Sequence, residues 1–440
     1  MLQLLFIPLF TSILFGSQNT NESNNNSLIV YDTIGLVHEK SSIQIKKTDK
    51  NIIYSNVASS IINDSVNIKL DNSIKIYSQQ YRFDKLTKNK LFQAHIDKEI
   101  LANNKKVILL SVDGDSCLVK NSYGQIYSVQ KDNVIFTHIP KELVTKPSLI
   151  WNIKANKDLN TTLKLDYLIK NIGFKSSYIL NIDDNKADLT GWLNINNRSG
   201  KSFKNTKLFI LAGDVNQVHK EINLYQQYRA VKVMNSIEKI DEQSYEGYHL
   251  YKIPFRVNLT NNEKTQIKFL RKDALKIKRK YKSNMSNPLY LHGQKTNKVS
   301  KYLYIEGLDV ALPNGIIRTY SKLKYKTIFL GENRITNISK NIPINIKIGN
   351  DFDIIVKETI KQRTDTKQYF DVDMLYIIKN NSQKNKEIEI IVPFQKNRYN
   401  TINTKQKYTV IDSNKIVFTL IVEANSSKSF MVNYKSRKIF

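Results

Sequence analysis

The sequence predicts an all-β fold made of antiparallel β-sandwich modules, with few and short helices. Hydrophobic side chains recur mainly at every second residue in short segments, which is the period of a strand with one buried face. The chain has 24 Tyr and 18 Phe, and this aromatic content favours strands. Clusters of Asn, Ser, Gly and Asp separate many of the segments and favour tight turns, which connect antiparallel strands.

The clearest alternating segments are predicted strands, and they lie along the whole chain. They cover residues 73–83, 106–112, 189–195, 206–212, 264–270, 342–348, 352–360, 374–378, 387–392, 416–422 and 428–434.

The length of 440 residues indicates more than one hydrophobic core, because single cores seldom exceed about 250 residues. We predict an N-terminal β domain at 28–147 and β-sandwich modules at 148–440. Within the first region, the very short strands of residues 98–140 resemble a small SH3-like barrel. Short helices are expected at 84–93 and at 218–240; the second falls in a variable excursion, 216–246, for which an irregular segment is the alternative.

The first sixteen residues predict a signal peptide. They contain no charged side chain and are mostly apolar, with a small residue, Gly16, at the end. Residues 17–27 are rich in Asn and predict a disordered terminus of the mature protein. We therefore expect an exported protein, periplasmic or extracellular, with no transmembrane segment after cleavage. An uncleaved anchor is the alternative, although spanning a bilayer takes about 20 apolar residues.

Two polar clusters indicate an internal repeat. Residues 196–200 read Asn-Asn-Arg-Ser-Gly and residues 379–383 read Lys-Asn-Asn-Ser-Gln, and each cluster lies between two predicted strands. Two related sandwich modules would explain this pattern.

The strongest functional signal is the basic charge. The formal net charge is +29, and most of it lies beyond residue 147. Residues 264–282 contain nine Lys or Arg and one acid, Asp273. On a strand, Lys276, Lys278 and Lys280 would share one face and form a cationic stripe.

This stripe predicts an anionic partner, such as an acidic polysaccharide or a membrane surface. Export makes nucleic acid an unsuitable partner. The alternative is that the lysines form a solvated strand face without a ligand. The sequence does not specify an oligomeric state.

Candidate catalytic residues are sparse, and we assign no catalytic, cofactor or metal-binding residue. The six His are isolated and Cys117 is the one cysteine, which indicates a small buried side chain rather than a metal ligand. Three Asp-x-Asp pairs offer the alternative of a secreted hydrolase, because paired carboxylates on one strand face suit hydrolysis. These pairs are Asp113/Asp115, Asp351/Asp353 and Asp371/Asp373.

Several blocks resemble the bacterial family named domain of unknown function 4139. They include residues 189–200, 207–216, 248–254, 312–315, 331–335 and 347–353, in the family's order. The resemblance runs from about residue 150 to the C-terminus. It implies a secreted, β-sandwich-rich bacterial protein, distantly related to mucoidy-inhibitor-like proteins, although this chain lacks their long coiled coil. The family offers no catalytic residues to carry over. Trp192, in the first block, is predicted to be a core or inter-sheet aromatic residue.

Overall fold

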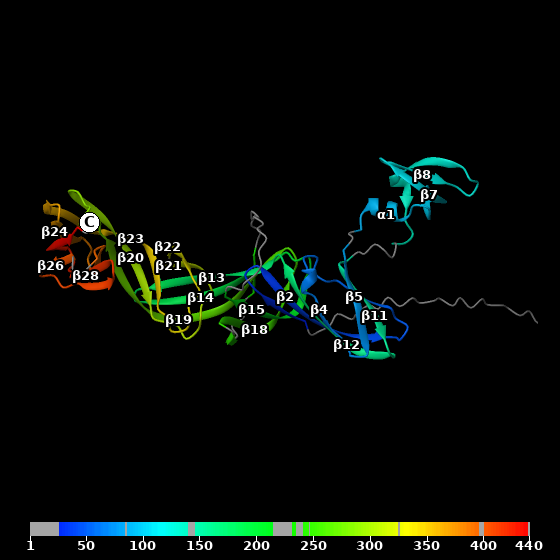
Figure 1. Cartoon of the computed structure of the whole chain (residues 1–440), viewed down its shortest axis with the longest axis horizontal. Coiled ribbons are helices and arrows are strands. Elements are labelled where there is room, and N and C mark those ends of the chain that lie inside the picture. Colours follow the sequence, from blue (N-terminus) through cyan, green and yellow to red (C-terminus); the bar gives the residue numbers. More distant parts are fainter. Residues whose placement is uncertain are drawn as a thin grey trace, which may run out of the picture.

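A computed structural model describes residues 26–83, 86–139, 146–213, 231–234, 241–245, 247–323, 326–395 and 400–438. The molecule is elongated and consists almost entirely of strands, so the predicted all-β class is confirmed (Figure 1). The predicted signal peptide, residues 1–16, lies outside the described residues. The predicted disordered terminus does too, apart from its last two residues, of which Ser27 begins the first strand.

The first sandwich packs a seven-stranded sheet against a three-stranded sheet. The larger sheet has the order β17-β18-β15-β1-β2-β12-β4, with bounds Asp241–Tyr245, Tyr248–Leu259, Phe203–Ala212, Ser27–Val30, Ile34–Ile45, Leu159–Lys170 and Asn67–Lys69. The smaller sheet has the order β3-β11-β5, with bounds Asn51–Ser55, Ser148–Ala155 and Ile74–Arg82. Alternate side chains of both sheets enter one core, in which Trp151 and Tyr167 are fully buried. A 3-10 turn, Asn63–Ser65, precedes β4.

A small unit is inserted between β5 and β11. Its five-stranded sheet has the order β10-β6-β7-β8-β9, with bounds Val134–Ile135, Glu99–Ala102, Lys105–Asp113, Ser116–Lys120 and Ile126–Gln130. Its core is its own and includes Phe92 from helix α1, Lys88–Ala94, which falls where a helix is predicted. Within the described residues no pairing joins the end strands β9 and β10, and the SH3-like barrel stays a prediction.

A long sheet forms the rest of the molecule. Its main path is β22-β21-β13-β14-β19-β20-β23-β24-β29-β26, with bounds Lys326–Ile335, Gly315–Leu323, Ile172–Asp183, Lys186–Asn197, Glu263–Asn284, Gln294–Ile305, Ile344–Asp365, Tyr369–Asn380, Ser426–Arg437 and Asn400–Asn403. Four strands branch from this path: β16 (Val231–Met234), β25 (Lys386–Val392), β27 (Thr409–Asp412) and β28 (Lys415–Val422). β25, β27 and β28 cover the C-terminal half of the sheet and enclose the core of a second sandwich.

Two strands of 22 residues, β19 and β23, run from the first core into the second (Figure 1). The alternating segments predicted at 342–348 and 352–360 are therefore parts of one strand. A bulge joins them, since β20 shifts register between Asn297 and Val299 opposite β23. Sequence periodicity detects such a bulge as a break because the pattern of buried residues changes phase there.

The second sandwich repeats the first, whose core is also lined by side chains of β13, β14 and β19 from the long sheet. In both, a hairpin strand ends in an Asn-x-Ser-x-Lys turn and pairs with a strand further along the chain: β14 with β19, and β24 with β29. The strand after the turn pairs with another strand of the second layer: β15 with β18, and β25 with β28. That same strand also has a parallel neighbour, β1 in the first sandwich and the second half of β19 in the second.

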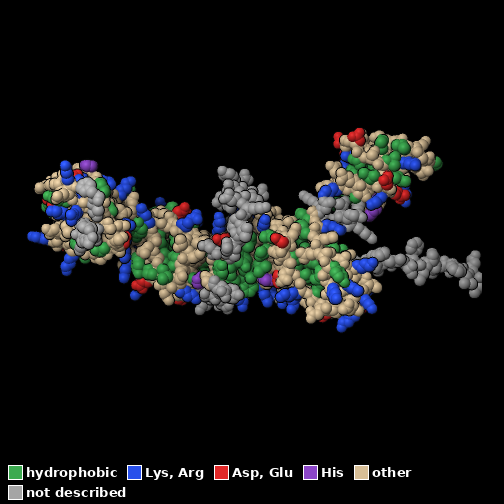
Figure 2. Space-filling model, viewed as in Figure 1, with side chains coloured by type: hydrophobic (Ala, Val, Ile, Leu, Met, Phe, Trp, Pro, Cys, Tyr) green, Lys and Arg blue, Asp and Glu red, His purple; other side chains and the backbone are tan. Residues whose placement is uncertain are grey.

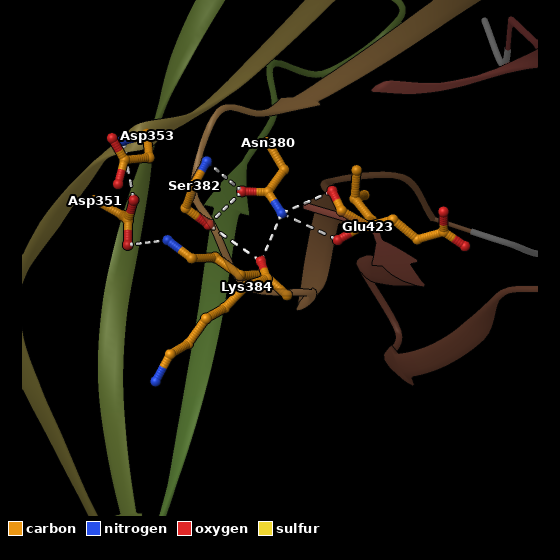
Figure 3. Close-up of polar contacts among 8 residues, drawn as sticks. Asp351, Asp353, Asn380, Ser382, Lys384 and Glu423 are labelled. Atoms are coloured by element: carbon orange, nitrogen blue, oxygen red, sulfur yellow. Dashed lines mark hydrogen bonds and ion pairs between the residues drawn. The ribbon is translucent and has the colours of Figure 1, made fainter. Parts of the chain in front are cut away.

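The two turns share their hydrogen bonds, which confirms the predicted repeat. The Asn197 amide donates to the carbonyls of Lys201 (2.8 Å) and Leu259 (3.0 Å), and its Oδ1 accepts from the Ser199 backbone N–H. The Asn380 amide likewise donates to the carbonyls of Lys384 (2.9 Å) and Val422 (3.1 Å), as Figure 3 shows in part. Its Oδ1 accepts from the Ser382 backbone N–H at 3.0 Å.

One predicted domain and one predicted helix are wrong. Residues 28–147 are not a separate domain, because β1 and β2 pair with β15 and β12, and β3 and β5 pair with β11. Among the described residues of 28–147, only the inserted unit between β5 and β11 has a core of its own. The helix predicted at 218–240 is also wrong for residues 231–234, which form strand β16, whereas residues 218–230 and 235–240 lie outside the described residues.

Candidate anionic-surface binding site

The three predicted lysines lie on one face of β19. Lys276 and Lys278 are exposed and Lys280 is half-buried, whereas Ile277 and Tyr281 between and beyond them are buried. The strand alternation predicted from the sequence therefore holds in this part of β19. These lysines, together with their cross-strand neighbours Tyr302, Tyr304 and Lys347, are called the lysine–tyrosine face below.

Tyrosines of β20 lie beside the lysines. Lys278 is paired with Tyr304 and Lys280 with Tyr302 in the register of the two strands, so these side chains share a face. The Lys280 ammonium is 4.9 Å from the centre of the Tyr304 ring, a cation–π distance. On the next strand, β23, exposed Lys347 is paired with Tyr302 and extends the face. The sequence did not indicate these tyrosines, because strand register is needed to place them.

The three lysines also lack acidic partners. Within the described ranges no ion pair involves Lys276, Lys278 or Lys280, whereas two other lysines of β19, Lys272 and Lys282, are neutralised. Lys272 contacts Asp309 at 2.6 Å, and Lys282 contacts Glu389 at 2.7 Å. Figure 2 shows Lys and Arg side chains along the whole molecule, with few Asp and Glu among them. An anion approaching this face therefore meets uncompensated positive charge.

The Asp-x-Asp pairs do not converge on one site. Asp113 and Asp115 lie at the exposed turn between β7 and β8. The Asn433 side-chain amide donates to both Asp371 (2.6 Å) and Asp373 (2.9 Å), which explains that pair as a hydrogen-bonded strand face.

In the third pair the two carboxylates have different environments. Asp351 forms a buried ion pair with Lys386, at 2.8 Å, and the backbone N–H of Asp353 donates to the Asp351 carboxylate, as Figure 3 shows. In the part of the chain that the structure describes, no three His, Cys, Asp or Glu side chains are grouped to hold a metal. Cys117 is buried, as predicted, and burial raises the pKa of its thiol.

A second cluster of charged side chains lies on the opposite face of β19 and β20. It consists of Arg279, Tyr281, Lys301, Asp351 and Lys386, and we call it the waist cluster because it lies between the two cores. Lys301 is paired with Tyr281, and the Lys386 ammonium is 4.9 Å from the centre of the Tyr281 ring. Burial lowers the pKa of Lys301, and the positive charges of Arg279 and Lys386 add to this effect, against the opposing effects of Asp351 and Asp353.

One sequence-predicted core residue is differently placed. Trp192 is half-buried and lies under the Lys268 ammonium at 5.3 Å, on the face opposite to buried Leu193 and Ile195. Trp192 and Leu193 are consecutive residues of one strand and therefore face opposite sides of the sheet, so they cannot both enter the same core.

No family model matches the chain, and no curated protein matches it. The resemblance to domain of unknown function 4139 therefore stays a prediction. None of the helices in the described residues is long and apolar enough to cross a membrane.

Proposed function

We propose that this chain is an exported, non-enzymatic protein that binds anionic polymers of the cell envelope through the lysine–tyrosine face. The observation that carries the proposal is the set of three lysines without acidic partners, interleaved with tyrosines on the neighbouring strand. An acidic polysaccharide suits this surface better than a bilayer does, because tyrosine rings can pack against sugar rings while ammonium groups contact carboxylates. Membership of the domain of unknown function 4139 family is part of the same proposal.

The proposal is tested by changing Lys276, Lys278 and Lys280 to Gln. Gln is uncharged and only one atom shorter than Lys, and none of the three positions is buried, so each substitution should change the free energy of unfolding by less than about 0.5 kcal/mol. Binding of the triple variant to an acidic polysaccharide, measured by calorimetry, should be weaker than that of the parent. The loss should be largest at low ionic strength, where screening is weakest.

The chain itself offers a matched control. Lys40, Lys164 and Lys69 are exposed and form one cross-strand row on the first sandwich, because Lys164 is paired with both of the others. Changing these three to Gln lowers the net charge by the same amount and leaves the lysine–tyrosine face intact. Equal losses in both triple variants would show that binding follows net charge alone and would contradict the proposal.

Two further arms separate the partners and the location. Vesicles of anionic lipid should bind less well than the polysaccharide at equal charge concentration, and the reverse order would favour a membrane surface.

Mass spectrometry of protein from the native envelope should recover a chain that begins near residue 17. An intact Met1 in a cytoplasmic fraction would contradict export.

A further inference from the structure

Corresponding strands of the two sandwiches make corresponding pairings, and this identifies equivalent residues. The two turn asparagines donate to the carbonyls of Leu259 and Val422, which are therefore equivalent. Three residues before each of these, Arg256 pairs with Lys207 of β15 and Thr419 pairs with Glu389 of β25, so Lys207 corresponds to Glu389. Their parallel partners, Ser27 and Lys282, are then equivalent as well. The antiparallel partners of Ser27 and Lys282 are His38 and Ser300. The residues that follow these partners, Glu39 in β2 and Lys301 in β20, are therefore equivalent as well.

Side-chain contacts at the neighbouring position support this correspondence. His38 of β2 is hydrogen-bonded to Asp166 of β12 at 2.6 Å. At the equivalent place, Ser300 of β20 donates to Asn350 of β23 at 3.2 Å. The next residues inward, Val37 and Val299, are both fully buried.

The first sandwich neutralises its buried charge completely. The Glu39 carboxylate is almost inaccessible, with 1% of its side chain exposed, and it forms an ion pair with Lys201. The Tyr54 hydroxyl donates to Glu39 at 2.9 Å and the Tyr167 hydroxyl at 3.4 Å. Leu165 is the cross-strand neighbour of Glu39 and is itself fully buried, so this position is closed by protein atoms.

The second sandwich places the opposite charge at the equivalent position and leaves it open. Lys301 is half-buried, and within the described residues it forms neither a hydrogen bond nor an ion pair. The carboxylate with the largest effect on Lys301, that of Asp351, is already bound to Lys386 at 2.8 Å. The cross-strand neighbour of Lys301 is Gly349, and a side chain built on this glycine would meet no atom within 4 Å.

Arg279 adds a second cation that no carboxylate neutralises. It lies two residues before Tyr281, on the same face of β19, and its guanidinium donates to the Asn185 side-chain oxygen at 3.0 Å and to a backbone carbonyl. Both acceptors are neutral. Three cations, Arg279, Lys301 and Lys386, thus lie near two carboxylates, Asp351 and Asp353, of which Asp351 is bound to Lys386. This excess of positive charge in a partly buried place is unfavourable without a further anion.

We propose that the waist cluster binds an oxyanion group, a phosphate, sulfate or carboxylate, at the open side of Gly349, with Lys301 and Arg279 as its ligands. The ligand anion takes the place that the Glu39–Lys201 pair fills internally in the first sandwich. Guanidinium and ammonium groups are the usual protein ligands of such anions. The site lies on the opposite side of β19 from the lysine–tyrosine face, so it is independent of the function proposed above.

The test measures the binding of inorganic phosphate, sulfate and glucuronate by calorimetry at constant ionic strength, with the full chain. At least one of these anions should bind with one site per chain, and which of them binds identifies the source of the oxyanion. Lys301→Met should reduce its affinity by about tenfold or more, the usual worth of a hydrogen bond to a charged group. Lys298→Met, an exposed lysine on the same strand, should bind as the parent does.

Two further variants separate loss of anion binding from misfolding and from loss of the lysine–tyrosine face. Arg279→Gln should also weaken binding, which covers the case in which Lys301→Met does not fold. The triple Gln variant of the lysine–tyrosine face should bind the small anion normally, which separates this site from the proposed function. The proposal would be overturned if none of the three anions bound with one site per chain. It would also be overturned if the parent, Lys301→Met and Arg279→Gln bound the anion with equal affinity.

Discussion

The first and second sandwiches share a strand order and a turn, yet they differ in charge at one equivalent position. Glu39 in the first sandwich is enclosed by Lys201 and two tyrosines. Lys301 in the second faces the space beside Gly349. A repeated scaffold can therefore keep its hydrogen-bonded turn and core while one position changes from an internal ion pair to a surface that accepts a ligand.

The largest effect is expected where the internal ion pair is broken. Lys201→Met leaves the Glu39 carboxylate buried without its cation and should lower the free energy of unfolding by about 3–5 kcal/mol. The matched control is Lys384→Met, at the equivalent place in the second turn, where the lysine is exposed. It should cost less than about 0.5 kcal/mol. Equal costs in denaturant unfolding would show that the two sandwiches do not differ in this respect.

An intermediate effect is expected at the feature that the sandwiches share. Asn197→Ala and Asn380→Ala each remove an amide that bonds two or more backbone carbonyls. Each should lower the free energy of unfolding by about 1–3 kcal/mol, because buried carbonyls lose their donors. Chemical denaturation of the two variants should give similar losses, and a loss confined to one of them would break the equivalence of the turns.

The smallest effect is expected at Lys301, and its sign depends on pH. Burial lowers the pKa of Lys301 below the ordinary value of 10.5. In the window between the lowered pKa and 10.5, the unfolded chain binds more protons than the native chain, so native stability rises with pH. Lys301→Met lacks this contribution. Without added oxyanion it should be slightly more stable than the parent at neutral pH, by less than about 1 kcal/mol, and should lose this advantage as pH rises.

This pH dependence is measured by thermal unfolding of the parent and Lys301→Met over the alkaline range. Lys298→Met serves as the control, because its lysine is exposed on the same strand. A constant difference between the parent and Lys301→Met across the range would contradict a lowered pKa at Lys301.

Much of the fold could be predicted from local pattern, because alternation and turn residues act over a few positions. The strand of Lys276, Lys278 and Lys280 and the repeated Asn-x-Ser turns are of this kind. The extent of β23 was missed, since its bulge near Asp351 interrupts the alternation. The pairing of Ser27–Val30 with β15 was missed as well, because it joins residues about 180 positions apart in sequence.

The lysine stripe could be predicted as a set of residues, whereas its surroundings could not. Tyr302 and Tyr304 join it through the register of β19 and β20, which no local signal specifies. The waist cluster was missed altogether, because Lys301 and Lys386 are ordinary lysines in the sequence. Only the comparison with Glu39 shows that one of them lacks the carboxylate that the fold provides elsewhere.

The most direct test of this account is the pKa of the Lys301 ammonium, measured by NMR titration of the full chain. The spectrum of Lys301→Met assigns the signal. In a chloride buffer the pKa should lie below 10.5, and addition of the bound oxyanion should raise it, because the anion favours the charged form. A pKa at its ordinary value that does not respond to phosphate, sulfate or glucuronate would contradict the claim that the second sandwich holds an unneutralised charge.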